Sequence, residues 1–179
     1  MYGRTKLMIY LPAIFALAVC VMNTSAEDIY TDCSEQGNVI SVTLKDCSAP
    51  PCNAQGGTTI PLAITFKSYG NVTSGKARMC MKVSGKEKCH KEVAEIDNFC
   101  DSTLDRCPLK TGDVQTYTTN FPFPDLALLT IATYELLDQN CQQITCVEIP
   151  IRIISENTDD TKFPSASANA PCSKLRNTI

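Results

Sequence analysis

The segment "RMCMKVSGKEKCHKEV" (Arg78–Val93) is the most informative part of the sequence, because it has the features of a β-hairpin closed by a disulfide. Apolar and polar residues alternate up to Ser84-Gly85, a dipeptide that suits a two-residue hairpin turn. Counting outward from such a turn places Cys80 opposite Cys89 at a non-hydrogen-bonded pair, where a disulfide can form. The alternative is that each of these cysteines pairs elsewhere in the chain.

Further segments predict β-strands through alternation or β-favouring residues. In the segment 38–47, alternation places Ile40, Val42 and Leu44 on one face. In the segment 59–70 it places Ile60, Leu62, Ile64 and Phe66 on one face, with Pro61 near the start of the strand. These segments are "NVISVTLKDC" (38–47), "TIPLAITFKSYG" (59–70), "VQTYTTNF" (114–121) and "ITCVEIPIRII" (144–154).

The segment "LALLTIATYELLD" (126–138) is ambiguous, since Leu126, Leu129, Thr133 and Leu136 would also form a helical stripe. Ile131 and the strand-like neighbours favour a strand. Between the strands lie turn signals such as "CSAPPCNAQGG" (47–57), rich in proline and glycine. About seven short strands and no convincing helix predict an all-β, immunoglobulin-like β-sandwich.

The two ends of the chain differ from the rest. Residues 1–26 combine a basic start, an apolar run and small residues before Ala26, as in a secretory signal peptide; a membrane anchor is the weaker alternative. Residues 27–155 are expected to form one domain, and residues 156–179 a polar tail. No later apolar run is long and charge-free enough to span a bilayer.

Charge and residue content exclude several functional classes. Loss of the signal would remove Arg4 and Lys6 but no acidic residue from a chain of net charge −3, and a mildly acidic domain argues against nucleic acid as a partner. Of eleven cysteines, ten would remain, an even number suited to an oxidising compartment. His90 is the only histidine, so we expect no enzyme, metal site or cofactor; His90 as a base or metal ligand is the weaker reading.

Several fragments together resemble the ML lipid-recognition domains, and within that family most closely the Niemann–Pick type C2 sterol carriers. They are "DCSEQGNVISVTLKDCSAPPC", "IPLAITF", "CDSTLDRCPL" and "LLDQNCQQITCVEIPIRI", which span roughly Asp32 to Ile154. The resemblance implies the disulfides Cys33–Cys146, Cys47–Cys52 and Cys100–Cys107. With Cys80 and Cys89 in the hairpin, Cys141 and Cys172 are left to pair; the rival reading leaves Cys172 free or intermolecular.

The resemblance also implies two sheets that separate to hold a lipid, with no covalent chemistry. Alternation then supplies candidate wall residues, although the same pattern describes an ordinary core. Tyr134 stands where the sterol carriers have tryptophan. The candidates from alternation are Leu62, Ile64, Phe66, Met79, Met81, Val83, Tyr117, Ile149 and Ile151, and the resemblance adds Phe121, Phe123 and Tyr134.

Two features could form the entrance to such a cavity. Phe121 and Phe123, in a proline-broken segment like the family's portal loop, could be exposed aromatics that guide a lipid, or could cap the core. Alternation places Lys86, Lys88 and His90 with the apolar side of the hairpin, so we expect the lysines at a rim that suits an anionic head group. The alternative is solvated charge that protects an edge strand.

The sequence thus predicts a secreted or endolysosomal lipid-binding and transfer protein that acts as a monomer, with a sterol, fatty acid or anionic lipid as ligand and contact with a membrane or membrane receptor. "NVT" makes Asn71 a candidate glycosylation site. One alternative is a recognition protein or immune co-receptor that senses a microbial lipid. Another is a disulfide-rich extracellular module with a solid core.

Overall fold

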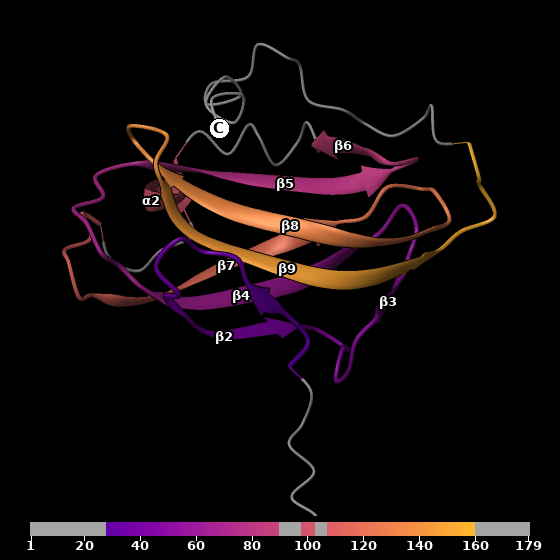
Figure 1. Cartoon of the computed structure of the whole chain (residues 1–179), viewed down its shortest axis with the longest axis horizontal. Helices are drawn as coiled ribbons and strands as arrows, with labels where there is room; N and C mark the ends of the chain where they lie inside the picture. Colours follow the sequence, from indigo (N-terminus) through magenta and orange to yellow (C-terminus); the bar gives the residue numbers. More distant parts are fainter. Residues whose placement is uncertain (1–27, 90–97, 103–106, 160–179) are drawn as a thin grey trace, which may run out of the picture.

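Two β-sheets packed face to face form the protein, in a computed structural model that describes residues 28–89, 98–102 and 107–159. Figure 1 shows the layer of β5, β8 and β9 stacked on the layer of β2, β4 and β7, with a short helix, α2, at one end. The predicted all-β sandwich is confirmed. The predicted signal peptide lies outside the described residues, as do His90 and most of the tail.

The larger sheet has six strands in the order β1-β9-β8-β5-β6, with β3 paired in parallel to the outer edge of β9. All its other pairings are antiparallel. Its strands are β1 (Thr31–Asp32), β3 (Cys52–Gln55), β5 (Gly75–Val83), β6 (Lys86–Cys89), β8 (Leu128–Asp138) and β9 (Gln143–Ile154).

The smaller sheet has three antiparallel strands in the order β2-β4-β7. They are β2 (Val39–Leu44), β4 (Thr59–Lys67) and β7 (Val114–Pro122). Pro61 lies near the start of β4, beyond the last ladder pair with β2, and its carbonyl oxygen accepts from the Lys45 amide at 3.0 Å. The ambiguous segment 126–138 is a strand over most of its length, as the flanking strands suggested.

The predicted hairpin is confirmed with its register. Cys80 pairs with Cys89 across β5 and β6, and the two are joined by a disulfide. Ser84 and Gly85 both have positive φ, 51° and 75°, as the two-residue hairpin turn that matches strand twist requires. The register of this hairpin therefore follows from the local sequence alone.

The face predicted for the first strand is wrong at Ile40. Its side chain is 53% exposed, whereas Val42 and Leu44 are buried as expected. A register shift between Val39 and Ser41 interrupts the ladder between β2 and β4. Such a bulge breaks the two-residue period, so the alternation cannot be extended through it.

Two other expectations need correction. Cys52–Gln55, interpreted as part of a turn, is strand β3, and with the two-residue β1 it brings the described strands to nine rather than about seven. The cysteine-closed segment near residue 100 begins with one helical turn, α2 (Phe99–Ser102). No helix in the described ranges is long and apolar enough to cross a membrane.

A buried polar side chain joins the two sheets at one end of the sandwich. Asn38, 3% exposed, donates from Nδ2 to the carbonyl oxygen of Lys67 on β4, at 2.8 Å, and to that of Ile144 on β9, at 2.7 Å. Its backbone carbonyl also accepts from the Lys67 amide at 3.0 Å. Asn38 therefore fixes the separation of the layers at this end.

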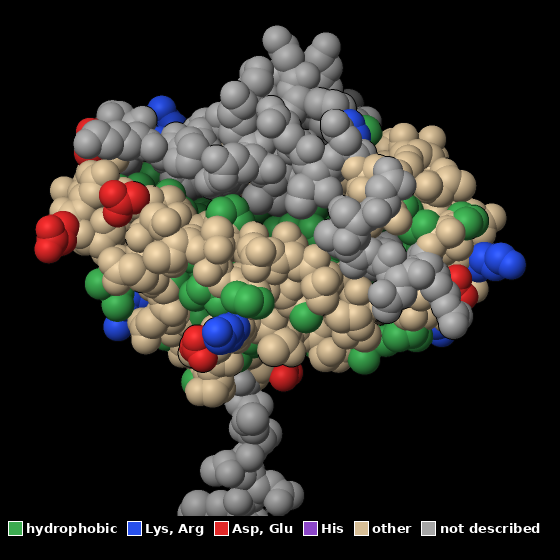
Figure 2. Space-filling model, turned by 180° about the vertical axis from the view of Figure 1, so that it is seen from behind, with side chains coloured by type: hydrophobic (Ala, Val, Ile, Leu, Met, Phe, Trp, Pro, Cys, Tyr) green, Lys and Arg blue, Asp and Glu red, His purple; other side chains and the backbone are tan. Residues whose placement is uncertain are grey.

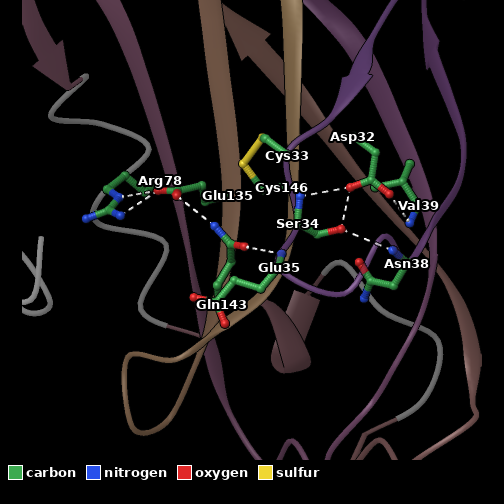
Figure 3. The surroundings of a disulfide bond; sticks show 10 residues. All are labelled: Asp32, Cys33, Ser34, Glu35, Asn38, Val39, Arg78, Glu135, Gln143 and Cys146. Carbon is green, nitrogen blue, oxygen red and sulfur yellow. Dashed lines mark hydrogen bonds and ion pairs between the residues drawn. A yellow bond between two sulfur atoms is a disulfide. The ribbon is translucent and has the colours of Figure 1, made fainter. Parts of the chain in front are cut away.

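The loop before Asn38 is held by a local hydrogen-bond network (Figure 3). The Asp32 carboxylate accepts from the backbone amides of Ser34, at 2.8 Å, and Val39, at 3.0 Å, and also from the Ser34 hydroxyl. The Ser34 hydroxyl oxygen in turn accepts a hydrogen bond from the backbone amide of Asn38 at 3.1 Å. These bonds orient Asn38 toward both sheets.

The structure contains the four predicted disulfides whose two ends are described: Cys33–Cys146, Cys47–Cys52, Cys80–Cys89 and Cys100–Cys107. Cys141 is also disulfide-bonded, but its predicted partner Cys172 lies outside the described residues. Cys33 and Cys146 are 113 residues apart. The loop-entropy model assigns that long closure about 5 kcal/mol and each short one about 2 kcal/mol.

A polar chain crosses the outer face of the larger sheet beside Cys33–Cys146 (Figure 3). Glu135, only 2% exposed, pairs with Arg78 at 2.5 Å and accepts from Gln143 Nε2 at 3.0 Å. Gln143 Oε1 accepts from the Glu35 amide at 3.1 Å. The chain links β5, β8 and β9 to the segment after β1.

Replacing Gly75 by alanine should destabilise the fold. A Cβ there would lie 2.1 Å from the ring of Phe99 and 2.7 Å from the carbonyl oxygen of Leu137, both closely packed. We expect a loss of about 1–3 kcal/mol, the usual cost of overpacking, measured by urea denaturation. Gly70→Ala, where nothing lies within 4 Å, is the matched control and should change stability by less than about 0.5 kcal/mol.

Asn38→Asp should be far more harmful than its near-identical shape suggests. The carboxylate cannot donate to Lys67 and Ile144, and it would place charge against their buried carbonyl oxygens. We expect a loss of about 3 kcal/mol or more in the free energy of unfolding. Asn53→Asp, on the exposed side of β3, is the control. Equal denaturation midpoints for both variants would contradict the role given to Asn38.

Candidate functional site

The inner faces of both sheets form one apolar layer. All twelve candidate wall residues are at most 3% exposed and belong to a single buried cluster. They come from β4, β5, β7, β8 and β9 and from the segment after β7, so each sheet contributes. Alternation thus identified nine inward-facing positions correctly, and the three residues taken from the resemblance, Phe121, Phe123 and Tyr134, are also buried. The role of these residues as a cavity wall stays a prediction.

An aromatic cluster spans the space between the layers. Tyr117 on β7 lies 5.9 Å from Tyr134 on β8 between ring centroids, and their hydroxyl oxygens are 2.8 Å apart in a hydrogen bond. Phe121 lies 5.9 Å from Tyr134, and Phe99 of α2 lies 6.0 Å from Tyr117. The sheets therefore touch at the level of the two tyrosines, and a ligand between the sheets must lie beside this contact or displace it.

Burial strongly affects the two tyrosine hydroxyls. Desolvation raises the pKa of Tyr134 well above its ordinary value of 10.0, and the nearby Tyr117 raises it further. Desolvation also raises the pKa of Tyr117, although hydrogen bonding to Tyr134 and Thr119 opposes the shift. Both phenols therefore stay neutral at physiological pH and can donate and accept hydrogen bonds.

Phe121 and Phe123 do not form an exposed portal; they cap the end of the core. Phe121 is fully buried and Phe123 is 3% exposed, with ring centroids 4.8 Å apart. The backbone continues the ladder past Pro122, because the Phe123 amide donates to the Thr58 carbonyl at 2.9 Å. That bond holds Phe123 against β4, which explains why the proline-broken segment is not exposed here.

The lysines expected at the rim lie on the edge strand β6. Lys86, opposite Val83, is exposed, and Lys88, opposite Met81, is partly buried. Their partners Val83 and Met81 are each 1% exposed. The cross-strand pairing thus places the lysines where alternation predicted, while their contact with a ligand stays a prediction.

Surface charge is dispersed on the face seen from behind. Figure 2 shows basic and acidic side chains in small groups between hydrophobic and other atoms, without a patch of one sign in the coloured part. No group of three or more metal-ligating side chains was found among the described residues. The apolar interior is therefore the best-supported candidate site in the described part of the chain.

Three features of this interior were missed from the sequence. Phe99 could have been suspected only from its packing against Gly75, which no local pattern reveals. Thr119 shares the inward alternation of Tyr117 and Phe121, but threonine is ordinary in a strand. Thr145, fully buried on β9, has a hydroxyl without a hydrogen-bond partner among the described residues.

A protein-family model matches most of the chain. The model of the ML domain family matches residues 27–153, most of the chain. The chain is similar to "NPC intracellular cholesterol transporter 2 homolog a" of Drosophila melanogaster, with 31% identity over 79% of this chain and 97% of that protein. It is also similar to "NPC intracellular cholesterol transporter 2" of Danio rerio, with 27% identity over 70% of this chain and 85% of that protein.

A solved structure has the same fold. The crystal structure of a Niemann-Pick type C2 protein from the Japanese carpenter ant superposes with a TM-score of 0.62. The match covers 70% of this chain and 99% of that one, at 19% identity. The likeness at this identity establishes a shared architecture and says nothing of the ligand.

The buried Tyr134 predicts a loss of stability in alkali. Above the ordinary pKa of 10.0 the unfolded chain loses the phenol proton while the folded chain keeps it, so stability present below pH 10 falls as the pH rises toward the folded pKa. Tyr134→Phe should make denaturation midpoints measured from pH 8 to 11 fall less steeply. Equal slopes for the wild-type protein and Tyr134→Phe would refute the assignment.

Proposed function

The chain belongs to the ML domain family, and from this premise we propose that it is a secreted, non-catalytic protein that binds a lipid between its two β-sheets and carries it. The observation that carries the proposal is the single apolar cluster built by the inner faces of both sheets. The relatives from Drosophila melanogaster and Danio rerio are named as cholesterol transporters, which makes a sterol the first ligand to test.

The energetics of such a site are favourable in outline. Each methylene removed from water is worth about 0.8 kcal/mol, so ten of them supply about 8 kcal/mol of gross binding energy. That gain must exceed a cost of about 4–15 kcal/mol for lost freedom on association. A ligand with a large rigid or long apolar body can exceed the lower part of this range, whereas a small polar metabolite, with few methylenes to bury, cannot.

The entry route is proposed to lie at the end of the sandwich that Phe121 and Phe123 cap. Their rings pack by apolar contact, and the segment holds to β4 through the bond from Phe123 to Thr58. The opposite end is fixed by Asn38 and by Cys33–Cys146. Apolar contacts can be exchanged for contacts with a lipid, so the capped end is the one that a ligand can open.

Secretion is supported by the cysteines. Every cysteine in the described ranges is disulfide-bonded, as expected in an oxidising compartment such as the extracellular space or the endolysosomal lumen. We further propose residues 1–26 as a signal peptide, 27–155 as the domain and 156–179 as the tail. Asn71 is exposed, as glycosylation requires. A monomer and contact with a membrane or membrane receptor complete the proposal.

Lipid uptake by the delipidated protein tests the function. We expect a fluorescent sterol or fatty acid to bind at about one-to-one stoichiometry, because one interior holds one ligand. Ala132→Phe adds bulk to the inner face between Met81 and Ile149 and should reduce affinity at least about tenfold. Thr133→Phe, on the outer face of the same strand, should bind normally.

These controls distinguish a lipid carrier from an extracellular module with a solid core. Circular dichroism must show that both variants fold, since overpacking alone can destabilise a sandwich. Native mass spectrometry of the secreted protein would show a co-purified lipid, the glycan mass and the oligomeric state together. No uptake of any lipid by the folded, delipidated protein would leave a disulfide-rich extracellular module as the remaining interpretation.

A further inference from the structure

The cysteine content identifies the disulfide partner of Cys141. The sequence has eleven cysteines, and the eight described cysteines other than Cys141 are joined to one another in four bridges. Cys141 is disulfide-bonded as well, so its partner within the chain is Cys20 or Cys172. Cys20 lies in the proposed signal peptide, which secretion would remove. On that premise, the cysteine left for Cys141 is Cys172.

This bridge would connect the C-terminal tail to the opposite end of the sandwich. Cys141 lies in the turn between β8 and β9, where the Cys141 amide donates to the Asp138 carbonyl at 3.0 Å. The described chain leaves at the other end, where the Asn157 carbonyl accepts from the Ala127 amide at 2.7 Å, just before β8 begins. Figure 1 shows the turn between β8 and β9 and the end of β9 at opposite ends of the molecule.

The length of the tail limits the path between these two points. Fifteen residues separate Asn157 from Cys172, and they span at most about 50–54 Å when fully extended. The eleven residues of β8, which lie between the same two ends, span about 36 Å at 3.3 Å per residue. A detour around the smaller sheet would add the layer spacing of about 10 Å at each end and exceed that reach. The direct path lies over the outer face of the larger sheet.

A groove follows this path along β8. Two adjoining hollows on the outer face share Lys82 and Ile131. The first hollow includes Leu129, near the start of β8, and the second extends to Gln143, two residues after Cys141. Together they are called the outer groove below. The outer groove therefore runs from the place where the described chain ends toward Cys141.

The beginning of the outer groove presents apolar surface. Leu129 is 66% exposed and Ile131 43%, although both are large hydrophobic residues next to each other on the outward side of β8. Pro150 pairs with Ile131, and Ile154, at the end of the same strand, is 55% exposed. A contiguous apolar patch of this kind commonly marks a contact site.

The composition of the tail suits an extended segment on this face. Residues 164–170, "PSASANA", alternate proline or alanine with serine or asparagine. In an extended chain, this alternation turns small apolar side chains to one side and polar ones to the other. The small side chains can then lie against a sheet while the polar ones remain in water.

The tail has one aromatic residue, Phe163, and its position matches the apolar patch. Phe163 lies six residues after Asn157, a reach of about 20 Å at 3.3 Å per residue. Ile131 lies four residues after Ala127, to which Asn157 is bonded, or about 13 Å along β8. The Phe163 side chain can therefore reach Leu129 and Ile131.

We propose that residues 160–172 form a strap that docks in the outer groove. Its aromatic side chain packs on Leu129 and Ile131, and a disulfide from Cys172 to Cys141 secures its far end. The occupant of this apolar face is thus a segment of the same chain, which keeps the face from contact with a second copy. The inference goes beyond the proposed lipid binding, because the strap lies on the opposite side of the larger sheet from the apolar interior.

Peptide mapping tests the covalent part of the proposal. Mass spectrometry of the secreted, unreduced monomer should find Cys141 and Cys172 in one linked pair of peptides, which separates on reduction. A free Cys172, or a Cys172 joined to a second chain, would overturn the strap.

Photo-crosslinking tests the docking. A photoreactive benzoylphenylalanine in place of Phe163 should crosslink, within one chain, to the peptide that contains Leu129 and Ile131. The same group in place of Asn177, beyond Cys172, is the control and should give little of this product. A crosslink to a second chain would assign the groove to a second copy. A crosslink to lipid alone, with phosphatidylcholine vesicles present, would assign it to a membrane surface, and either result would overturn the strap.

Limited digestion with trypsin measures how firmly the strap is held. Phe163→Ala, which keeps every disulfide, should increase cleavage after Lys162 about tenfold or more, because cleavage of a docked segment follows the population of its open form. Cleavage after Arg176, beyond Cys172, is the internal control and should keep its rate. The double variant Cys141→Ser/Cys172→Ser, which leaves neither thiol unpaired, should increase cleavage after Lys162 further.

The outcomes separate the strap from the lipid carrier. Both variants should take up the fluorescent sterol like the wild-type protein, since the strap lies outside the sandwich. Equal cleavage after Lys162 in the wild-type protein and both variants would overturn the strap and leave the carrier standing. A wild-type protein that is protected at Lys162 but takes up no lipid would overturn the proposed function and leave the strap standing.

Discussion

The architecture depends on the buried amide of Asn38, which bonds to a backbone carbonyl of each sheet. Because these acceptors belong to the backbone of β4 and β9, the spacing of the layers at this end does not depend on how apolar side chains pack. The disulfide Cys33–Cys146 ties the segment before Asn38 to β9. The far end has the aromatic cap of Phe121 and Phe123, where ring packing is combined with backbone hydrogen bonds of Phe123 to Thr58 and Gly57.

The two kinds of contact between the layers differ in how easily a ligand can replace them. Aromatic contacts between the sheets are not directional to the degree that hydrogen bonds are, so a lipid can replace them with contacts of similar energy. The hydrogen bond between Tyr117 and Tyr134 is different, because breaking it leaves two buried hydroxyls that need new partners. A ligand that separates the two tyrosines must therefore supply hydrogen-bonding groups, whereas one that displaces only ring contacts need not.

The features that could be predicted from the sequence are those that depend on residues close together in the chain, such as a turn or the alternation within a strand. The register of Cys80 and Cys89 followed from the turn between them, and the inward residues of β9 followed from alternation. The predictions were wrong where pairing with a distant strand determines the structure. A bulge in the pairing of β2 with β4 turns the Ile40 side chain outward, and parallel pairing with β9 makes Cys52–Gln55 a strand. Thr119 could not have been singled out, because its position matters only through tyrosines that the fold brings to it.

The charged arm of the hairpin is explained without a ligand. Among the described strands, β6 is the outermost one beside β5, and lysines on an outermost strand oppose pairing of its edge with another chain. The disulfide Cys80–Cys89 holds this arm to β5 although its own side chains contribute little to the core. The cationic side chains of β6 can therefore serve the solubility of the edge, and their contact with a ligand stays a prediction.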